Sequence, residues 1–264
     1  MAELEITLDD GVATLTLNRP EARNALDDAI RAQLLDALLT IENDPAARCV
    51  VLRGTGDHFM AGGDIKTMVE NVDAPREEVR KYFLNRIHNL HPIVVAMRRM
   101  PKPILASVAG AAAGAGVSFA LACDLVVAAE DAFFTLAYVN IGTSPDGSAS
   151  FQLPRTLGIK RAMEMTLLGD RIDAAKALEW GLVNFVVPRI ELEDETAKLA
   201  GRLAKGPTRV YGRAKALLYR SIGSDYEAQL QAEADAFSDS ASRRDFREGI
   251  TAFVEKRRPV FTGE

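Results

Sequence analysis

Two glycine-rich turns in the sequence could present backbone N–H groups to an anion. The first, Phe59-Met-Ala-Gly-Gly-Asp-Ile-Lys66, follows an apolar strand, and its glycines allow a tight turn before Asp64, which could cap the next helix. Free N–H groups at the start of a helix stabilise developing negative charge. An ordinary strand–turn–helix connection explains the segment equally well.

The second turn lies in the segment from Val108 to Ser118 and follows the pattern GxxxGxG. This spacing differs from the GxGxxG of dinucleotide-binding proteins, and no Gly-Lys-Ser/Thr follows as in phosphate-binding loops. The small side chains predict a bare backbone that another group can approach closely. Close packing of a helix on a strand is the alternative explanation for the alanines.

One carboxylic acid stands at a sharp turn and could transfer a proton. It is Asp146, between Pro145, which fixes φ, and Gly147, which permits a sharp change of direction as a helix begins. An aspartate in this place usually caps the helix, and the residues alone favour that interpretation.

The hydrophobic pattern predicts the elements that position these residues. Strands are predicted at residues 4–8, 12–17, 49–52, 104–108, 125–128 and 133–136. Helices are predicted at residues 26–41, 76–100, 117–122, 159–168, 174–180, 191–204 and 207–221, with two more up to residue 254. From about Gly147 the pattern is wholly helical, and Pro92 lacks the N–H needed to continue the ladder of the long helix. The chain is therefore predicted to have an α/β core over residues 1–200 and a helical C-terminal region over residues 201–264.

Composition excludes several classes of protein. The chain has 264 residues and a net charge of −5, so one well-buried core is expected and a nucleic-acid partner is not. Cys49 and Cys123 both lie in apolar runs, which indicates packing residues in a reducing compartment rather than a disulfide or a metal site. No basic region typical of a signal peptide opens the chain. The uncharged run from Pro103 to Cys123 is interrupted by glycines and predicts a strand, a turn and a helix, so a cytoplasmic protein without membrane association is expected.

Several ordered motifs together resemble the enoyl-CoA hydratase/isomerase (crotonase) superfamily. They are Ala61-Gly-Gly-Asp-Ile-Lys66, Lys102-Pro-Ile-Leu-Ala-Ser-Val-Ala-Gly110, Ala122-Cys-Asp124, Leu168-Gly-Asp-Arg171, Ala175–Val183 and Glu248–Lys256. The resemblance implies a spiral of ββα units like that of ClpP with a helical C-terminal region. It also implies an acyl-CoA substrate, no cofactor or metal besides the CoA of the substrate, and a homotrimer or a dimer of trimers built through the C-terminal region.

The resemblance also assigns roles to particular residues. The N–H groups of Gly63 and Ala115 would form an oxyanion hole for the thioester oxygen. The residues implied to contact CoA or substrate are Arg23, Ala25, Ala61, Asp64, Ile65, Lys66, Ser118, Tyr138, Phe253 and Lys256. Phe253 and Lys256 would approach CoA held by a neighbouring subunit, although a lysine at a helix end is also common on a plain surface. The acyl group would be selected by the stretch 67–82, with Met68 and Val72 in it.

The chain departs from the hydratases of this superfamily at two positions. Ser118 and Tyr138 stand where the hydratases have glutamates, and addition of water needs two groups that orient water and move its protons. Asp146 instead resembles the acid/base of the isomerases, which include the enoyl-CoA isomerases and the ring-epoxide/oxepin-CoA isomerase of phenylacetate degradation. The expected reaction is a double-bond shift or ring isomerisation through a thioester enolate. A raised pKa for Asp146 is expected from an apolar surround of Phe151, Val139 and Tyr138.

Three alternatives remain open at this stage. Hydratase activity is one of them. A second is a dehalogenase or thioester hydrolase, because haloaryl-CoA dehalogenases of the superfamily use an aspartate nucleophile here and a histidine near His91. The third is a non-catalytic, RNA-binding relative, which the negative net charge disfavours.

Overall fold

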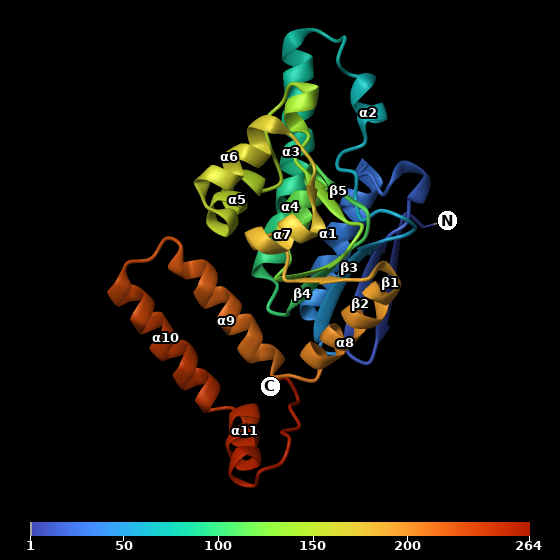
Figure 1. Cartoon of the computed structure of the whole chain (residues 1–264). Coiled ribbons are helices and arrows are strands. Elements are labelled where there is room, and N and C mark those ends of the chain that lie inside the picture. Colours follow the sequence, from blue (N-terminus) through green and yellow to red (C-terminus); the bar gives the residue numbers. More distant parts are fainter. Residues whose placement is uncertain (1) are drawn as a thin grey trace.

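The core is built around a six-stranded sheet (Figure 1). The computed structural model describes residues 2–264. In spatial order the strands are β1 (Leu4–Asp9), β2 (Val12–Leu17), β3 (Cys49–Gly54), β4 (Ile104–Val108), β6 (Leu125–Ala129) and β9 (Phe185–Val187). β1 and β2 form an antiparallel hairpin, whereas every later neighbour in the sheet is parallel. Both hairpin turn residues, Asp10 and Gly11, have positive φ, as a type I′ turn requires.

A second, smaller sheet carries the glycine-rich segment. Its strands are β5 (Ala111–Ala113), β7 (Phe133–Thr135) and β8 (Ile172–Asp173). β5 pairs parallel with β7, which pairs antiparallel with β8. The segment from Val108 to Ser118 was predicted as a turn that leads into a helix, but it also contains the short strand β5 before that helix begins.

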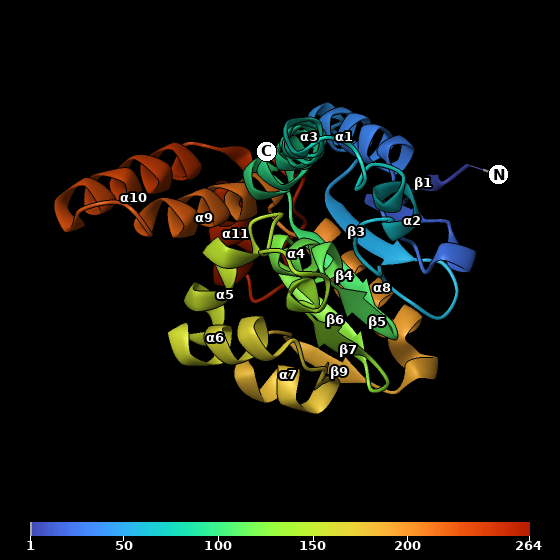
Figure 2. The same ribbon diagram turned by 90° about the horizontal axis from the view of Figure 1, so that it is seen from above.

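Helices cover both faces of the large sheet because alternate strand residues point to opposite sides. On β3, Val50 and Leu52 belong to the main core with α1 and α3, whereas Cys49 and Val51 pack with residues of α8. Figure 2 shows α1 and α3 side by side over one face. The helices are α1 (Asp28–Asn43), α2 (Ile65–Val69), α3 (Arg76–Arg99), α4 (Ala115–Ala122), α5 (Ala149–Leu157), α6 (Ile159–Leu168), α7 (Ala174–Trp180), α8 (Leu192–Ala204), α9 (Thr208–Ser221), α10 (Tyr226–Ala241) and α11 (Arg244–Val254).

Most of the predicted elements are confirmed, but the last third is not wholly helical. The short strands β8 and β9 lie within it. β9 has three residues and pairs with the edge of the large sheet beside β6, while β8 has two. Strands this short give no readable period in the sequence, because their pairing is set by distant neighbours.

The C-terminal helices α9 to α11 project from the core as an arm (Figure 1). Lys215 of α9 fastens the arm, since its Nζ donates to Asp124 at 2.9 Å and to the carbonyl oxygen of Met97 at 2.8 Å. The division expected at residue 200 falls inside α8, which covers the sheet as far as Ala204. No helix within residues 2–264 is both long and apolar enough to cross a membrane.

Candidate active site

A cavity of about 900 Å³ opens among the two glycine-rich turns, α3 and the loop that carries Asp146. Gly63, Ala115 and Asp146 all line it, so the structure brings together the three residues that the sequence singled out. Residues 2–264 contain no group of three or more His, Cys, Asp or Glu side chains arranged to hold a metal ion.

The first turn is held by backbone hydrogen bonds on both sides of Gly63. The N–H of Leu26 donates to the carbonyl oxygen of Gly62 at 2.7 Å, and the N–H of Asp64 donates to that of Leu26 at 3.1 Å. The N–H of Gly63 itself has no acceptor among the described residues. The predicted cap is confirmed, because Asp64 Oδ1 accepts the N–H of Lys66 at 3.0 Å.

The second turn ends at Gly114, which has φ 52° and ψ −117°, and the next residue, Ala115, is the first of α4. The N–H of Ala115 finds no acceptor in the described part of the chain, as expected at a helix N-terminus. A Cβ on Gly62 would lie only 2.9 Å from the carbonyl oxygen of Ala113 and 3.5 Å from the nitrogen of Ala115. The two turns therefore approach each other because residue 62 has no side chain, and two unpaired N–H groups line the same cavity.

Asp146 is not a helix cap. The helix after it, α5, has Ser148 at its N-cap position, and only the backbone carbonyl of Asp146 accepts the N–H of Ala149. The carboxylate accepts instead the hydroxyl of Tyr138, with 2.6 Å between Oη and Oδ1. The hydroxyl of Ser118 donates to the carbonyl oxygen of Asp146 at 2.9 Å and fixes the backbone of the loop. The interpretation that the residues alone favoured was wrong, because the carboxylate has a tertiary partner.

Burial raises the pKa of Asp146 above its ordinary value. The hydrogen bond from Tyr138 opposes this rise in pKa most strongly, and the nearby charges of Arg86 and Arg31 also oppose it. Burial also raises the pKa of Tyr138, and the adjacent Asp146 charge raises it further, so the tyrosine stays a proton donor to the carboxylate.

The apolar surround expected for Asp146 is only partly present. Tyr138 lines the cavity, but neither Val139 nor Phe151 does. Val139 is 45% exposed, and the ring of Phe151 is covered by the guanidinium groups of Arg98 and Arg155. Burial raises the pKa of Asp146, and of the three expected neighbours only Tyr138 lines the cavity with it.

The other residues expected at the site divide into two groups. Those that line the cavity with Tyr138 are Ala61, Ile65, Met68, Val72 and His91. Those that do not line it are Arg23, Ala25, Asp64, Lys66 and Ser118. Phe253 and Lys256 lie at the end of the arm, on α11 and just after it, and Phe253 is 83% exposed. α11 lies far from α2 and α3 (Figure 1), and neither residue lines the cavity within one chain.

Sequence reasoning missed two arginines that line the cavity, Arg31 of α1 and Arg86 of α3. Both lie on the buried stripe of their helix: Arg31 precedes Leu34 by three residues, and Arg86 precedes Leu90 by four. A charged residue within an apolar helical stripe is the signal that could have found them.

The chain is similar to known proteins over nearly its whole length. The sequence profile of the enoyl-CoA hydratase/isomerase family matches residues 7–264. The chain is 38% identical to a 1,2-epoxyphenylacetyl-CoA isomerase of Escherichia coli over 97% of each chain. It is also 38% identical to a probable enoyl-CoA hydratase of Rhodobacter capsulatus, over 97% of this chain and 96% of the relative. Among solved structures, a putative enoyl-CoA hydratase/isomerase from Mycobacterium abscessus superposes with a TM-score of 0.93 at 36% identity, covering 99% of this chain and all of the other.

Proposed function

Because the chain belongs to the enoyl-CoA hydratase/isomerase family, whose fold it shares, we propose that it is an acyl-CoA isomerase. It would shift a double bond, or rearrange a ring, next to the thioester. One observation carries the proposal: among the described residues that line the cavity, Asp146 is the only carboxylic acid, and it shares the cavity with two free N–H groups.

The N–H groups of Gly63 and Ala115 would hold the thioester oxygen. When a proton leaves the carbon next to the carbonyl, negative charge moves onto that oxygen, and two donors already in place stabilise it without reorganisation. Each donor of this kind contributes roughly 3–4 kcal/mol to lowering a barrier. The free N–H at the start of α4 supports this role, since it also lies at the positive end of a helix.

Asp146 would move the proton. In the ionised form its carboxylate takes a proton from the carbon beside the thioester of a 3-enoyl-CoA, which gives a dienolate and a protonated Asp146. It then returns the proton two carbons further along, and the conjugated 2-enoyl-CoA is left. No electrons enter or leave, so the CoA of the substrate is the only coenzyme in the proposal. The hydrogen bond from Tyr138 would hold the carboxylate where it can reach both the carbon that loses the proton and the carbon that receives it.

A second candidate function follows from His91, which lines the cavity with Asp146. In a dehalogenase or thioester hydrolase, Asp146 would attack carbon as a nucleophile and a histidine would activate water. The hydrogen bond from Tyr138 engages only Oδ1 of the Asp146 carboxylate, so it is compatible with a base as well as with a nucleophile, and turnover separates the two roles. Hydratase activity has less support, since Ser118 donates to a backbone carbonyl and Tyr138 to Asp146, which leaves neither hydroxyl free for water.

A panel of CoA esters tests the proposal. We expect the purified protein to convert 3-hexenoyl-CoA to 2-hexenoyl-CoA, followed by the absorbance of the conjugated thioester. Faster hydration of crotonyl-CoA than isomerisation would overturn the isomerase in favour of a hydratase. Release of halide from 4-chlorobenzoyl-CoA, or of free CoA, would overturn the isomerase in favour of a dehalogenase or thioester hydrolase. If the protein bound RNA and turned over none of the esters, it would be a non-catalytic, RNA-binding relative.

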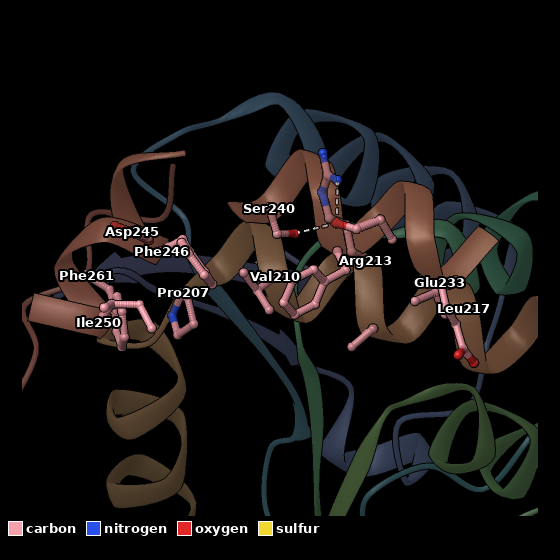
Figure 3. A pocket seen from close by; sticks show the side chains of 14 residues that line it. Pro207, Val210, Arg213, Leu217, Glu233, Ser240, Asp245, Phe246, Ile250 and Phe261 are labelled. Carbon is pink, nitrogen blue, oxygen red and sulfur yellow. Dashed lines mark hydrogen bonds between the residues drawn. The ribbon is translucent and has the colours of Figure 1, made fainter. Parts of the chain in front are cut away.

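The arm of α9 to α11 supports the proposal that the protein assembles as a trimer or a dimer of trimers. Figure 3 shows an apolar groove among these helices, lined by side chains that include Val210, Leu217, Phe246 and Ile250. Phe237, which also lines the groove, is 68% exposed. Exposed apolar side chains gathered on one surface are typical of an interface. Such an assembly would also let Phe253 and Lys256 reach the CoA of a neighbouring subunit.

The state of assembly is measured by the mass from light scattering after size-exclusion chromatography. We expect three or six times 28.7 kDa for the intact chain. Phe237→Asp should lower the mass, because it places a charge in the apolar surface. A monomeric mass for the unmodified protein at micromolar concentration would contradict the assembly and leave the isomerase proposal untouched.

A further inference from the structure

Two buried arginines lie in the wall of the proposed acyl cavity. Arg31 of α1 and Arg86 of α3 are each 5% exposed, and both line the cavity together with Asp146. A guanidinium this far from water normally has acceptors for most of its N–H groups, because burial of an unpaired charge is strongly unfavourable. Among the described residues, the hydrogen-bond acceptors around these two side chains are fewer than their N–H groups.

Asp28 is the one acid paired with them among the described residues. Arg31 donates to Asp28 through Nη2, and Arg86 Nη1 lies 3.8 Å from the same carboxylate. The Asp28 side chain is 79% exposed, so water screens much of its charge. Arg86 Nη2 has a carbonyl acceptor, that of Leu26, at 3.2 Å. The Nε of Arg31 is buried and has no acceptor in the described part of the chain.

Asp146 does not supply the missing acceptor. Its carboxylate is bonded to Tyr138 at 2.6 Å, and neither guanidinium forms an ion pair with it within residues 2–264. Burial, and after it the positive charge of Arg86, lower the pKa of Arg31 to about 10. An incoming anion would relieve both effects, since it would supply acceptors and reduce the repulsion between the two cations.

We propose that Arg31 and Arg86 bind a carboxylate carried by the acyl group, so that the preferred substrates are mono-CoA thioesters of dicarboxylic acids. This inference rests on the proposed function for the placement of the acyl group in the cavity. A planar guanidinium fits a carboxylate with two parallel N–H···O bonds, which a lysine could not provide. An acyl chain that ends in a methyl group would leave these donors unpaired and desolvated.

The position of Arg86 limits the length of the acyl group. Its Nη2 lies 3.6 Å from the point that a Cβ on Gly63 would occupy, so the arginine adjoins the turn that would hold the thioester oxygen. The substrate carboxylate must then lie few bonds from the thioester. Acyl groups of about four to six carbons meet this condition, at ~1.5 Å for each carbon–carbon bond.

Calorimetric titration with saturated CoA esters, which cannot isomerise, tests the carboxylate site directly. Butyryl-CoA is compared with succinyl-CoA, and hexanoyl-CoA with adipyl-CoA; the members of each pair differ only in a terminal methyl or carboxylate. The carboxylated member of at least one pair should bind about 10- to 100-fold more tightly, the effect of charge-assisted hydrogen bonds. Equal or weaker binding of both carboxylated esters would overturn the proposal.

Variants separate recognition of the carboxylate from a general effect on the site. Arg31→Met should remove most of the preference and leave the Kd of hexanoyl-CoA little changed. Arg80→Met, on the exposed side of α3, is the matched control and should keep the preference. Equal weakening of both members of a pair by Arg31→Met would overturn the proposal, because the arginine would then only position the site.

Turnover distinguishes failure of this inference from failure of the proposed function. The enzyme should isomerise the mono-CoA ester of 3-hexenedioic acid with a higher kcat/KM than 3-hexenoyl-CoA. A binding preference for carboxylated esters in a protein that isomerises neither ester would overturn the isomerase and leave the carboxylate site standing. If the protein isomerised both esters with equal kcat/KM and bound them with equal Kd, the carboxylate site would be overturned and the isomerase would stand.

Discussion

The Asp146→Asn variant is expected to lose about 10²–10⁴-fold in kcat for double-bond isomerisation, the range for removal of a general acid/base. The amide keeps the size of the side chain and an oxygen that can still accept the hydroxyl of Tyr138, but it cannot carry the proton between carbons. The Kd of a saturated acyl-CoA should therefore remain that of the unmodified protein. Retention of more than a tenth of the turnover would refute the role of Asp146 as the proton carrier.

The pH profile gives an independent measure of the same carboxylate. Asp146 must be ionised to take a proton, and burial raises its pKa, so kcat/KM should fall on the acidic side at a higher pH than an ordinary aspartate would give. Tyr138→Phe removes the hydrogen bond that most strongly opposes this rise, so the acidic limb should move to still higher pH. If Tyr138 had only a structural role, Tyr138→Phe would lower the maximal kcat/KM but leave the acidic limb of the pH profile at the same pH.

The Ala115→Pro variant should lose about 10²–10³-fold in kcat/KM, the effect of removing one oxyanion donor. Ala115 is the first residue of α4, a position at which proline fits the helix and removes an N–H that has no partner in the helix. The substitution removes a hydrogen that only a ligand would use and puts the ring Cδ in its place, so the loss should be at least this large. Steady-state kinetics with 3-hexenoyl-CoA measure the loss, and the thermal unfolding temperature reports on the fold.

Ala174→Pro is the matched control for this substitution. Ala174 is the first residue of α7, its preceding residue Asp173 has the extended backbone that proline favours, and it does not line the cavity. This variant should keep full activity. If Ala115→Pro also kept full activity with an unchanged unfolding temperature, the N–H of residue 115 would have no part in catalysis.

Much of the fold could be predicted because it depends on local periodicity. The alternating residues of β2 and the apolar stripe of α1 gave clear periods of two and 3.6 residues, and the strand and helix predicted there were confirmed. The strands β8 and β9 were missed, since their two and three residues are strands only by pairing with β7 and β6. The turn glycines were also recognisable, and Gly62 and Gly114 do have positive φ.

The candidate site was predicted in its members but not in its contacts. Asp64 was identified as a cap from its place before a helix, and it caps α2. The same reasoning failed for Asp146, because Tyr138 stands eight residues away and no local rule brings a hydroxyl to that carboxylate. The arginines were missed for a related reason: a helical stripe shows that a residue is buried, but not which cavity it enters.

The sequence by itself thus determined the longer strands and helices and the glycine turns, because these depend on neighbours in the chain, and it also carried the resemblance to one family. The tertiary structure alone decided that the N–H groups of residues 63 and 115 line the same cavity as Asp146, and that Arg31 and Arg86 enter it. These contacts join residues separated by tens of positions. They form only when close packing of the core brings together the helices and loops that carry these residues. Because that packing joins distant parts of the chain, no short stretch of sequence reveals it.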